Sequence, residues 1–174
     1  VVSDDLLKVN LARIIMKNPI MTASGCFGFG LEYKEYFNPN ELGGIVTKGL
    51  TLEKRDGNYG IRISETPSGM LNSVGLENPG IDYFENVIIK EIVNNINVPI
   101  IVNINGKTIE EYTELASRID KIEEVDGIEL NISCPNVKDG GMAFGANEEI
   151  AAKVTKEVRK VTKKPLIVKL SPYV

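Results

Sequence analysis

Residues 99–131 read PIIVNINGKTIEEYTELASRIDKIEEVDGIELN, and this stretch carries the clearest prediction of the fold class. Its two ends, 99–103 and 127–131, are short, apolar and rich in β-branched residues, as expected of buried parallel strands. The segment between them predicts an amphipathic helix over 108–123, with apolar residues at helical spacing: Ile109, Tyr112, Leu115, Ile119 and Ile122. Strand, helix and strand in this order form a βαβ unit, whose two strands run parallel.

The same alternation continues on both sides of this unit. Apolar runs at 44–48 and 165–169 predict two more strands, and 19–24 is a weaker candidate for another. Amphipathic patterns over 81–96 and 147–163 predict two further helices. The chain is therefore α/β with a parallel sheet, either a barrel or an open sheet.

Local signals refine this outline. Thr108 and Glu111 form a predicted capping box, in which each side chain satisfies a free backbone N–H, and Asn147 is a predicted N-cap. Residues 9–18 predict a hairpin. The connection 50–80 contains seven residues that are glycine or proline. A connection this long and this rich in glycine and proline is usually functional.

Composition excludes several kinds of chemistry. The 174 residues include no His, so a Ser-His-Asp or Cys-His nucleophile system and a His/Cys zinc site cannot form within the chain. Cys26 and Cys134 are too few for a disulfide framework, which favours a cytoplasmic protein. The net charge of −4 and the absence of a long apolar run predict neither a nucleic-acid partner nor a membrane partner.

Each expected strand ends on a polar or cationic side chain. Within 127–131, Glu129 and Asn131 share one face, opposite the apolar Ile128 and Leu130. In α/β barrels the active site lies at the C-terminal ends of the strands. Five strand ends therefore predict a site there: Ser24, Lys48, Asn103, Asn131 and Lys169.

The stretch NISCPNVKDGGMAFG at 131–145 places Cys134 just after a strand end, in an expected loop. Gly140 and Gly141 would let that loop move as a lid. A free thiol has a pKa of about 8.5, so Cys134 is one of the few side chains here that can act as a base. By contrast, Cys26 stands in a glycine-rich turn that lacks the spacing of a phosphate-binding loop.

Several motifs occur in a fixed order: ASGCFGFG at 23–30, TKGLT at 47–51, NSVGLENPG at 72–80 and NISCPN at 131–136. Together they resemble the dihydroorotate dehydrogenase family, and NVKDGGMAFG at 136–145 resembles its class 1B subgroup. The resemblance covers nearly the whole chain.

The resemblance implies a flavin-dependent TIM (β/α)8 barrel that oxidises dihydroorotate to orotate in the de novo synthesis of the pyrimidine nucleotide UMP. Such a barrel has about 250 residues and eight βα units. We therefore expect residues 1–174 to be a single, incomplete FMN-binding barrel domain, with about the first five strands present and the C-terminal portion missing.

The resemblance also implies roles for individual residues. Cys134 matches the base that removes a proton from C5 of dihydroorotate, while hydride passes from C6 to FMN. The positions that match substrate-binding residues are Lys48, Asn72, Val74, Gly75, Leu76, Asn131 and Asn136. The positions that match FMN-binding residues are Ser24, Lys48, Gly49, Asn103, Asn131 and Lys169.

Class 1B resemblance implies a partner subunit that carries FAD and a 2Fe-2S cluster and passes electrons to NAD+, in a heterotetramer of two catalytic and two partner chains. Such a cluster needs four cysteines and this chain has two, so we expect the cluster on the partner. The alternatives are a class 1A enzyme that uses fumarate, another cysteine-using FMN barrel such as a tRNA dihydrouridine synthase, and a non-catalytic protein that kept the barrel.

Overall fold

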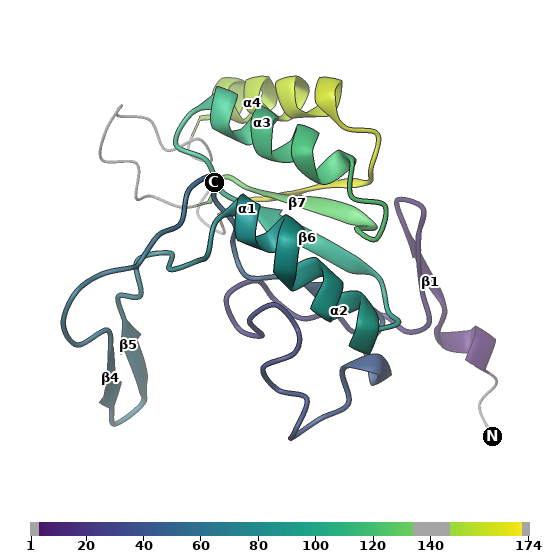
Figure 1. The fold of residues 1–174 in the computed structure, drawn as a ribbon, viewed down its shortest axis with the longest axis horizontal. Coiled ribbons are helices and arrows are strands. Elements are labelled where there is room, and N and C mark those ends of the chain that lie inside the picture. The colour runs from purple at the N-terminus through teal and green to yellow at the C-terminus, as the bar shows by residue number, and fades with distance from the viewer. Residues whose placement is uncertain (1–3, 134–146, 172–174) are drawn as a thin grey trace.

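The computed structural model describes residues 4–133 and 147–171, and its centre is a four-stranded parallel sheet (Figure 1). The strands are β3 (Ile45–Val46), β6 (Ile100–Ile104), β7 (Gly127–Asn131) and β8 (Leu166–Lys169), and they pair in chain order. A doubly wound open sheet would instead reverse its strand order at a switch point. A sheet in chain order is consistent with part of a barrel, and within the described residues it does not close on itself.

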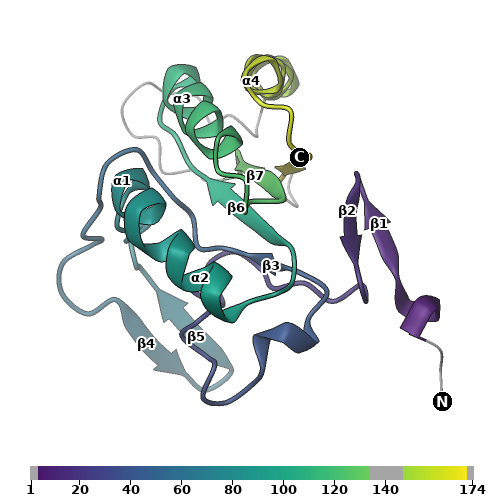
Figure 2. The same cartoon turned by 45° about the vertical axis from the view of Figure 1, so that its right-hand side comes forward.

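A helical layer covers one face of this sheet, as Figures 1 and 2 show. Its longer members are α2 (Ile89–Asn95), α3 (Ile109–Asp120) and α4 (Glu148–Val161). The strand residues under this layer are fully apolar, among them Ile45, Val102 and Leu130. No helix of the described residues is long and apolar enough to cross a membrane.

The opposite face of the sheet is closed near the amino ends of the strands by a hairpin. This hairpin joins β1 (Val9–Leu11) to β2 (Ile14–Met16), which confirms the prediction for residues 9–18. Ile14 and Met16 are buried against Val46 and Ile101. The hairpin therefore fills the inner face at one end and leaves the carboxyl ends of the strands for a site.

The predicted strand over 19–24 is wrong in its detail, because the segment makes only an isolated bridge from Met21 to Gly44. The Thr22 hydroxyl accepts from the Val46 N–H at 2.9 Å and donates to the Val46 carbonyl at 3.1 Å. A side chain thus takes the place of ladder hydrogen bonds beside β3. The segment follows the sheet edge without becoming a strand.

The predicted helix over 81–96 contains an unexpected wide turn. It begins as α1 (Ile81–Tyr83), continues as a π-helical turn (Phe84–Ile88) and ends as α2. Phe84 and Ile89 are both buried although they stand five positions apart. The π turn adds one residue to the helical repeat, so both side chains face the core.

The predicted caps are largely confirmed. The Glu111 N–H donates to Thr108 Oγ1 at 3.2 Å, and the Ile150 N–H donates to Asn147 Oδ1 at 3.1 Å. The carboxylate of Glu111 instead accepts from the Lys107 N–H at 2.7 Å, one residue earlier than a standard capping box requires. Helix α4 also stops at Val161 rather than at 163, because Thr162 is extended.

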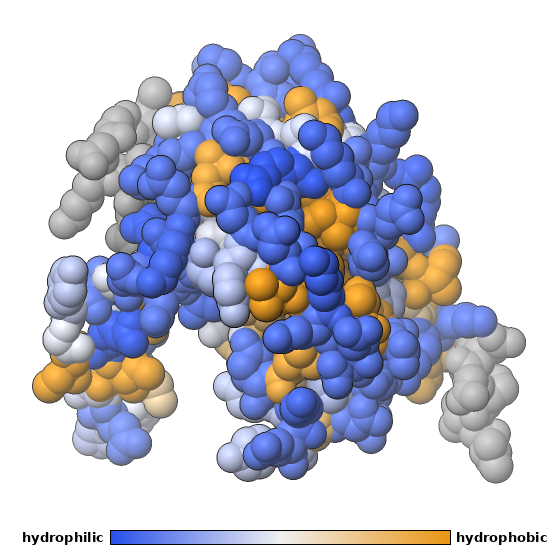
Figure 3. Space-filling model, in the orientation of Figure 1, coloured by the Kyte–Doolittle hydropathy of each residue, from blue (hydrophilic) through white to orange (hydrophobic). Residues whose placement is uncertain are grey.

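The connection 50–80 carries a second hairpin, made of β4 (Ile63–Thr66) and β5 (Gly69–Asn72), which projects from the body in Figure 1. Every residue of its two strands is exposed. Figure 3 shows an apolar band across it, and its large exposed side chains include Ile63, Met70 and Leu71. Short 3-10 helices at Asp4–Leu7 and Pro39–Glu41 complete the described elements.

Candidate functional site

Polar side chains gather on the inner face of the sheet, at the carboxyl ends of the strands. Asn103 on β6 pairs in register with Glu129 on β7, and Asn131 on β7 pairs with Lys169 on β8. Since successive strand residues alternate between faces, these four side chains share one face. The hairpin-covered apolar layer lies on the same face, nearer the amino ends. The structure thus brings together three of the five predicted strand-end residues on neighbouring strands.

Hydrogen bonds and an ion pair connect these side chains. Asn103 Nδ2 donates to Glu129 Oε1 at 2.5 Å, and Lys169 Nζ lies 3.6 Å from the same oxygen. Asn105 Nδ2 donates to Asn103 Oδ1 at 2.7 Å. Asn103 is fully buried and Glu129 is 9% exposed, so most of this network is shielded from solvent.

Lys48 and Gly49 follow β3 and reach the same edge. The Lys48 N–H donates to the Gly28 carbonyl at 2.7 Å, which joins this strand end to the glycine-rich turn. A Cβ atom on Gly49 would lie 2.4 Å from Asn105 Nδ2 and 3.0 Å from Leu76 Cδ1. Only glycine therefore lets the backbone pass this close to the inner-face amides.

The segment 74–76 lies against the same strand end. Gly75 and Leu76 both have left-handed backbone angles, with φ of +80° and +55°. Such a conformation is strained for leucine, and strained residues cluster at ligand-binding sites. The Val74 carbonyl accepts from the Asn58 N–H at 3.0 Å. Asn72, by contrast, ends β5 on the exposed hairpin.

Asn78 holds this segment in place, and it is not among the site residues predicted from the sequence. It is 3% exposed, its Nδ2 donates to the Leu76 carbonyl at 2.9 Å, and its Oδ1 accepts from the Thr51 N–H at 3.1 Å. The Gly80 N–H also donates to Oδ1, at 3.0 Å. The signal was present as Asn-Pro-Gly at 78–80, since Asn before a turn often bonds the backbone two residues on.

The start of the NISCPN motif is anchored from two sides. The Asn131 carbonyl accepts from the Tyr112 hydroxyl at 2.6 Å, and Asn131 Oδ1 accepts from the Ser133 hydroxyl at 2.7 Å. Asn131 as a whole is half-buried. Cys134 and Asn136, predicted as base and substrate ligand, lie outside the described residues.

Ser24 is half-buried and stands just before the glycine-rich turn, two residues after Thr22, whose hydroxyl bonds the Val46 backbone beside β3. In that turn the backbone N–H groups of Phe29, Gly30 and Leu31 donate to the Glu32 carboxylate at 2.9–3.0 Å. Consecutive N–H groups of this kind form an anion-binding nest. Here the anion is the carboxylate of Glu32 in the same chain. This agrees with the interpretation that the turn is structural and does not bind a phosphate.

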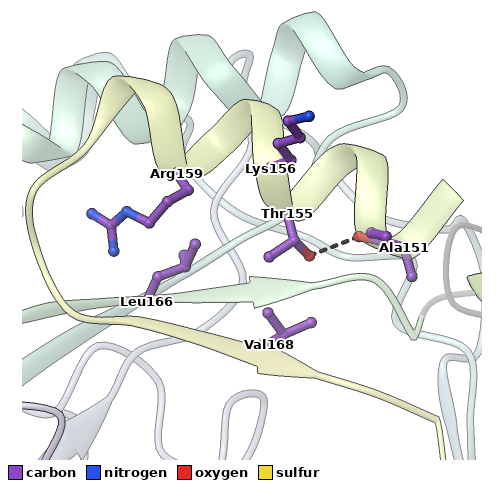
Figure 4. A pocket seen from close by; sticks show the side chains of 7 residues that line it. Ala151, Thr155, Lys156, Arg159, Leu166 and Val168 are labelled. Carbon is purple, nitrogen blue, oxygen red and sulfur yellow. Dashed lines mark hydrogen bonds between the residues drawn. The ribbon is translucent and has the colours of Figure 1, made fainter. Parts of the chain in front are cut away.

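One pocket lies away from these residues. It measures about 510 Å³ and opens between α4 and β8, on the helix side of the sheet (Figure 4). Its lining is mainly the apolar parts of Ala151, Leu166 and Val168, with Thr155, Lys156 and Arg159 at its border. It carries none of the predicted site residues. Among the described residues, no cluster of His, Cys, Asp and Glu could hold a metal ion.

Comparison with known proteins identifies the family. The family model described as dihydroorotate dehydrogenase matches residues 6–174. Relatives named "Dihydroorotate dehydrogenase B (NAD(+)), catalytic subunit" are 60% identical in Brachyspira hyodysenteriae, 56% in Thermoanaerobacter pseudethanolicus and 52% in Bacteroides thetaiotaomicron. Each alignment covers 97% of this chain and 55% of the relative, so the chain spans about half the length of these relatives. The chain belongs to the dihydroorotate dehydrogenase family.

Proposed function

We propose that this chain supplies the dihydroorotate-oxidising site of an FMN-dependent dihydroorotate dehydrogenase B, acting in the de novo synthesis of UMP. One observation carries the proposal. The Lys48–Gly49 strand end, the strained Leu76 and the inner-face amides of Asn103 and Asn105 all meet at the carboxyl ends of parallel strands. This is the end at which α/β barrels bind their substrates and cofactors.

The residues on the inner face suit a flavin. The flavin ring has carbonyl oxygens and ring nitrogens along one edge, and Lys169 and Asn131 offer an ammonium and an amide beside one another in register. Gly49 lets the backbone pass close to the amides of Asn103 and Asn105, where any Cβ would clash with them. We assign FMN contacts to Ser24, Lys48, Gly49, Asn103, Asn131 and Lys169. When bound, FMN supplies the acceptor for the hydride that leaves C6 of dihydroorotate.

The substrate contacts follow from the chemistry of orotate. Its ring carries two carbonyls, two N–H groups and a carboxylate. An Asn amide has both a donor and an acceptor, so Asn131 and Asn136 can pair with the ring edge. Asn72 is proposed as a third such ligand, although in this structure it ends the exposed strand β5. Lys48 provides a cation for the carboxylate, and no described side chain pairs with its ammonium. Val74, Gly75 and Leu76 contribute backbone groups from the segment that Asn78 holds.

Cys134 remains the proposed base. It follows Ser133, whose hydroxyl and backbone N–H both donate to Asn131 Oδ1, so the preceding residue is fixed to a proposed ligand. The Cys134 thiolate would take the C5 proton and become a thiol, while the two electrons of the C6–H bond leave as hydride. A double bond forms between C5 and C6, which turns dihydroorotate into orotate.

The electrons then need an acceptor outside this chain. The relatives' name specifies NAD(+) and a catalytic subunit, which supports a separate electron-transfer subunit. We propose that this partner carries FAD and a 2Fe-2S cluster, and that two catalytic and two partner chains form a heterotetramer. The two cysteines of this chain make no disulfide framework, so we place the enzyme in the cytoplasm.

The test uses the full-length protein, purified alone and with its partner. We expect a yellow protein whose flavin spectrum changes when orotate is added and bleaches anaerobically with dihydroorotate. Reoxidation by NAD+ in the complex, and not by fumarate, distinguishes class B from class 1A. A flavin spectrum that responds to neither orotate nor dihydroorotate would contradict the proposal.

A further inference from the structure

We propose that Glu129 is a positioning residue of the candidate site, which sets the amide of Asn103 and holds the ammonium of Lys169 on the inner face. The inference rests on the proposed function, because Asn103 and Lys169 are proposed FMN contacts. Glu129 itself is not among the proposed ligands. It acts through the two side chains that it binds.

The position of Glu129 in the sheet supports this role. Its register partners are Asn103 on β6 and Ile167 on β8. Along β7 it precedes Asn131 by two residues, so its carboxylate belongs to the layer just below the Asn131–Lys169 pair. The layer beneath is apolar and includes Val46 and Ile101. Glu129 thus stands at the boundary between the apolar floor and the polar strand ends.

The carboxylate dictates how the Asn103 amide is turned. A carboxylate can only accept hydrogen bonds, so the amide must present Nδ2 to Glu129 Oε1, at 2.5 Å. Asn103 Oδ1 then faces Asn105 Nδ2 at 2.7 Å. Without Glu129, the remaining contact of the Asn103 side chain, with the Asn105 amide, would not distinguish the Asn103 amide nitrogen from its oxygen.

The ion pair with Lys169 also supports a positioning role for Glu129. At 3.6 Å the ammonium lies within ion-pair distance of Glu129 Oε1 but beyond a good hydrogen bond. Burying a carboxylate is unfavourable, and replacing a buried pair with apolar residues is often neutral or stabilising. Stability is therefore a weak reason to have a carboxylate at this layer. A stronger reason is that the carboxylate holds the Lys169 ammonium and the Asn103 amide at the same part of the site.

FMN affinity of the full-length protein tests the proposal. The flavin is removed, and the dissociation constant is measured by quenching of FMN fluorescence. We expect Glu129→Gln to weaken FMN binding about tenfold, since a charge-assisted contact is lost and the glutamine can turn either end toward Asn103. Glu157→Gln on the outer helix α4 removes the same charge and serves as the matched control.

The sign of the effect separates positioning from simple repulsion. FMN is an anion, so a carboxylate that merely repelled it would give tighter binding in Glu129→Gln. Tighter or unchanged binding overturns the proposal. If Glu129→Gln does not fold, Glu129→Asp keeps the charge, moves it back by one methylene, and should weaken binding in the same direction.

Combining Glu129→Gln with Lys169→Met tests the route of action. If Glu129 acts through Lys169, its substitution weakens FMN binding by a smaller factor in the Lys169→Met background. If Glu129→Gln weakens FMN binding by the same factor in wild type and in Lys169→Met, Glu129 does not act through Lys169. A wild-type protein that binds no FMN would instead contradict the proposed function, so the two failures are distinguishable.

Discussion

Leu76 Cδ1 lies 3.0 Å from the point that a Cβ atom on Gly49 would occupy. The two residues are close in space although, in the sequence, one precedes and the other follows the exposed hairpin of β4 and β5. This close approach joins the end of β3 to the strained 74–76 segment. It also gives the glycine of the TKGLT motif a definite physical reason, because the backbone there has neighbours on two sides.

Gly49→Ala should therefore damage the site more than the fold. The new methyl would meet Asn105 Nδ2 and Leu76, and one of them must move; we expect orotate binding to weaken about tenfold, within the range of overpacking effects. The measurement is an orotate titration of the flavin spectrum. Gly69→Ala in the exposed hairpin is the control, since its nearest neighbour would be Thr66 Oγ1 at 3.9 Å. Equal effects of the two substitutions would contradict this account.

Asn78→Ala should destabilise the 76–80 segment and, with it, the site. The substitution leaves the Leu76 carbonyl and the Thr51 and Gly80 N–H groups without their partner, at about 1–3 kcal/mol for buried polar groups. We expect a lower midpoint of chemical unfolding of the full-length protein and weaker orotate binding.

The control for this change is Asn86→Ala, which removes an exposed amide that bonds only the Asp82 carbonyl on the helix surface. Its effect on the unfolding midpoint should be small, and its effect on orotate binding absent. If Asn78→Ala behaves like Asn86→Ala, then Asn78 does not hold the segment.

The limits of prediction from the sequence follow from the range of the interactions. Period-2 alternation in 127–131 is a local pattern, and it correctly placed Glu129 and Asn131 on one face. The bonds of Asn78 to Thr51 and of Asn103 to Glu129 join residues 27 and 26 positions apart. No local pattern encodes such pairs. The strand over 19–24 failed for a related reason, because the Thr22 side chain bonds Val46 from 24 positions away.

Asp120 gives the stability of the protein a pH dependence whose sign can be worked out. Partial burial raises the pKa of Asp120, but hydrogen bonds from the Thr162 hydroxyl and the Lys163 and Lys164 N–H groups outweigh it, so the pKa lies below its ordinary value. A carboxyl group of this kind stabilises the folded state above its unfolded pKa of about 3.9, and the stabilisation is lost as pH falls through the folded value.

Asp120→Asn should consequently lower stability at pH 7, and the difference from wild type should shrink as the pH falls below about 4. Chemical unfolding of the full-length protein between pH 7 and pH 3 measures this difference. Glu123→Gln, on the exposed loop before β7, removes one carboxylate as a control. A constant gap between wild type and Asp120→Asn at all pH values would show that the carboxyl charge contributes nothing.

Cys134 offers the most direct test of the chemistry. If its thiolate takes the C5 proton, Cys134→Ala should leave FMN and orotate binding nearly intact. Flavin reduction by dihydroorotate should slow by about 10²–10⁴-fold, as for loss of a general base. Cys134→Ser should also be slow but should recover at high pH, because a hydroxyl is a weaker acid than a thiol. Anaerobic stopped-flow absorbance measures the reduction, and Cys26→Ala, in the glycine-rich turn, is the matched control. Reduction of Cys134→Ala at a rate close to that of Cys26→Ala would remove Cys134 from the role of base.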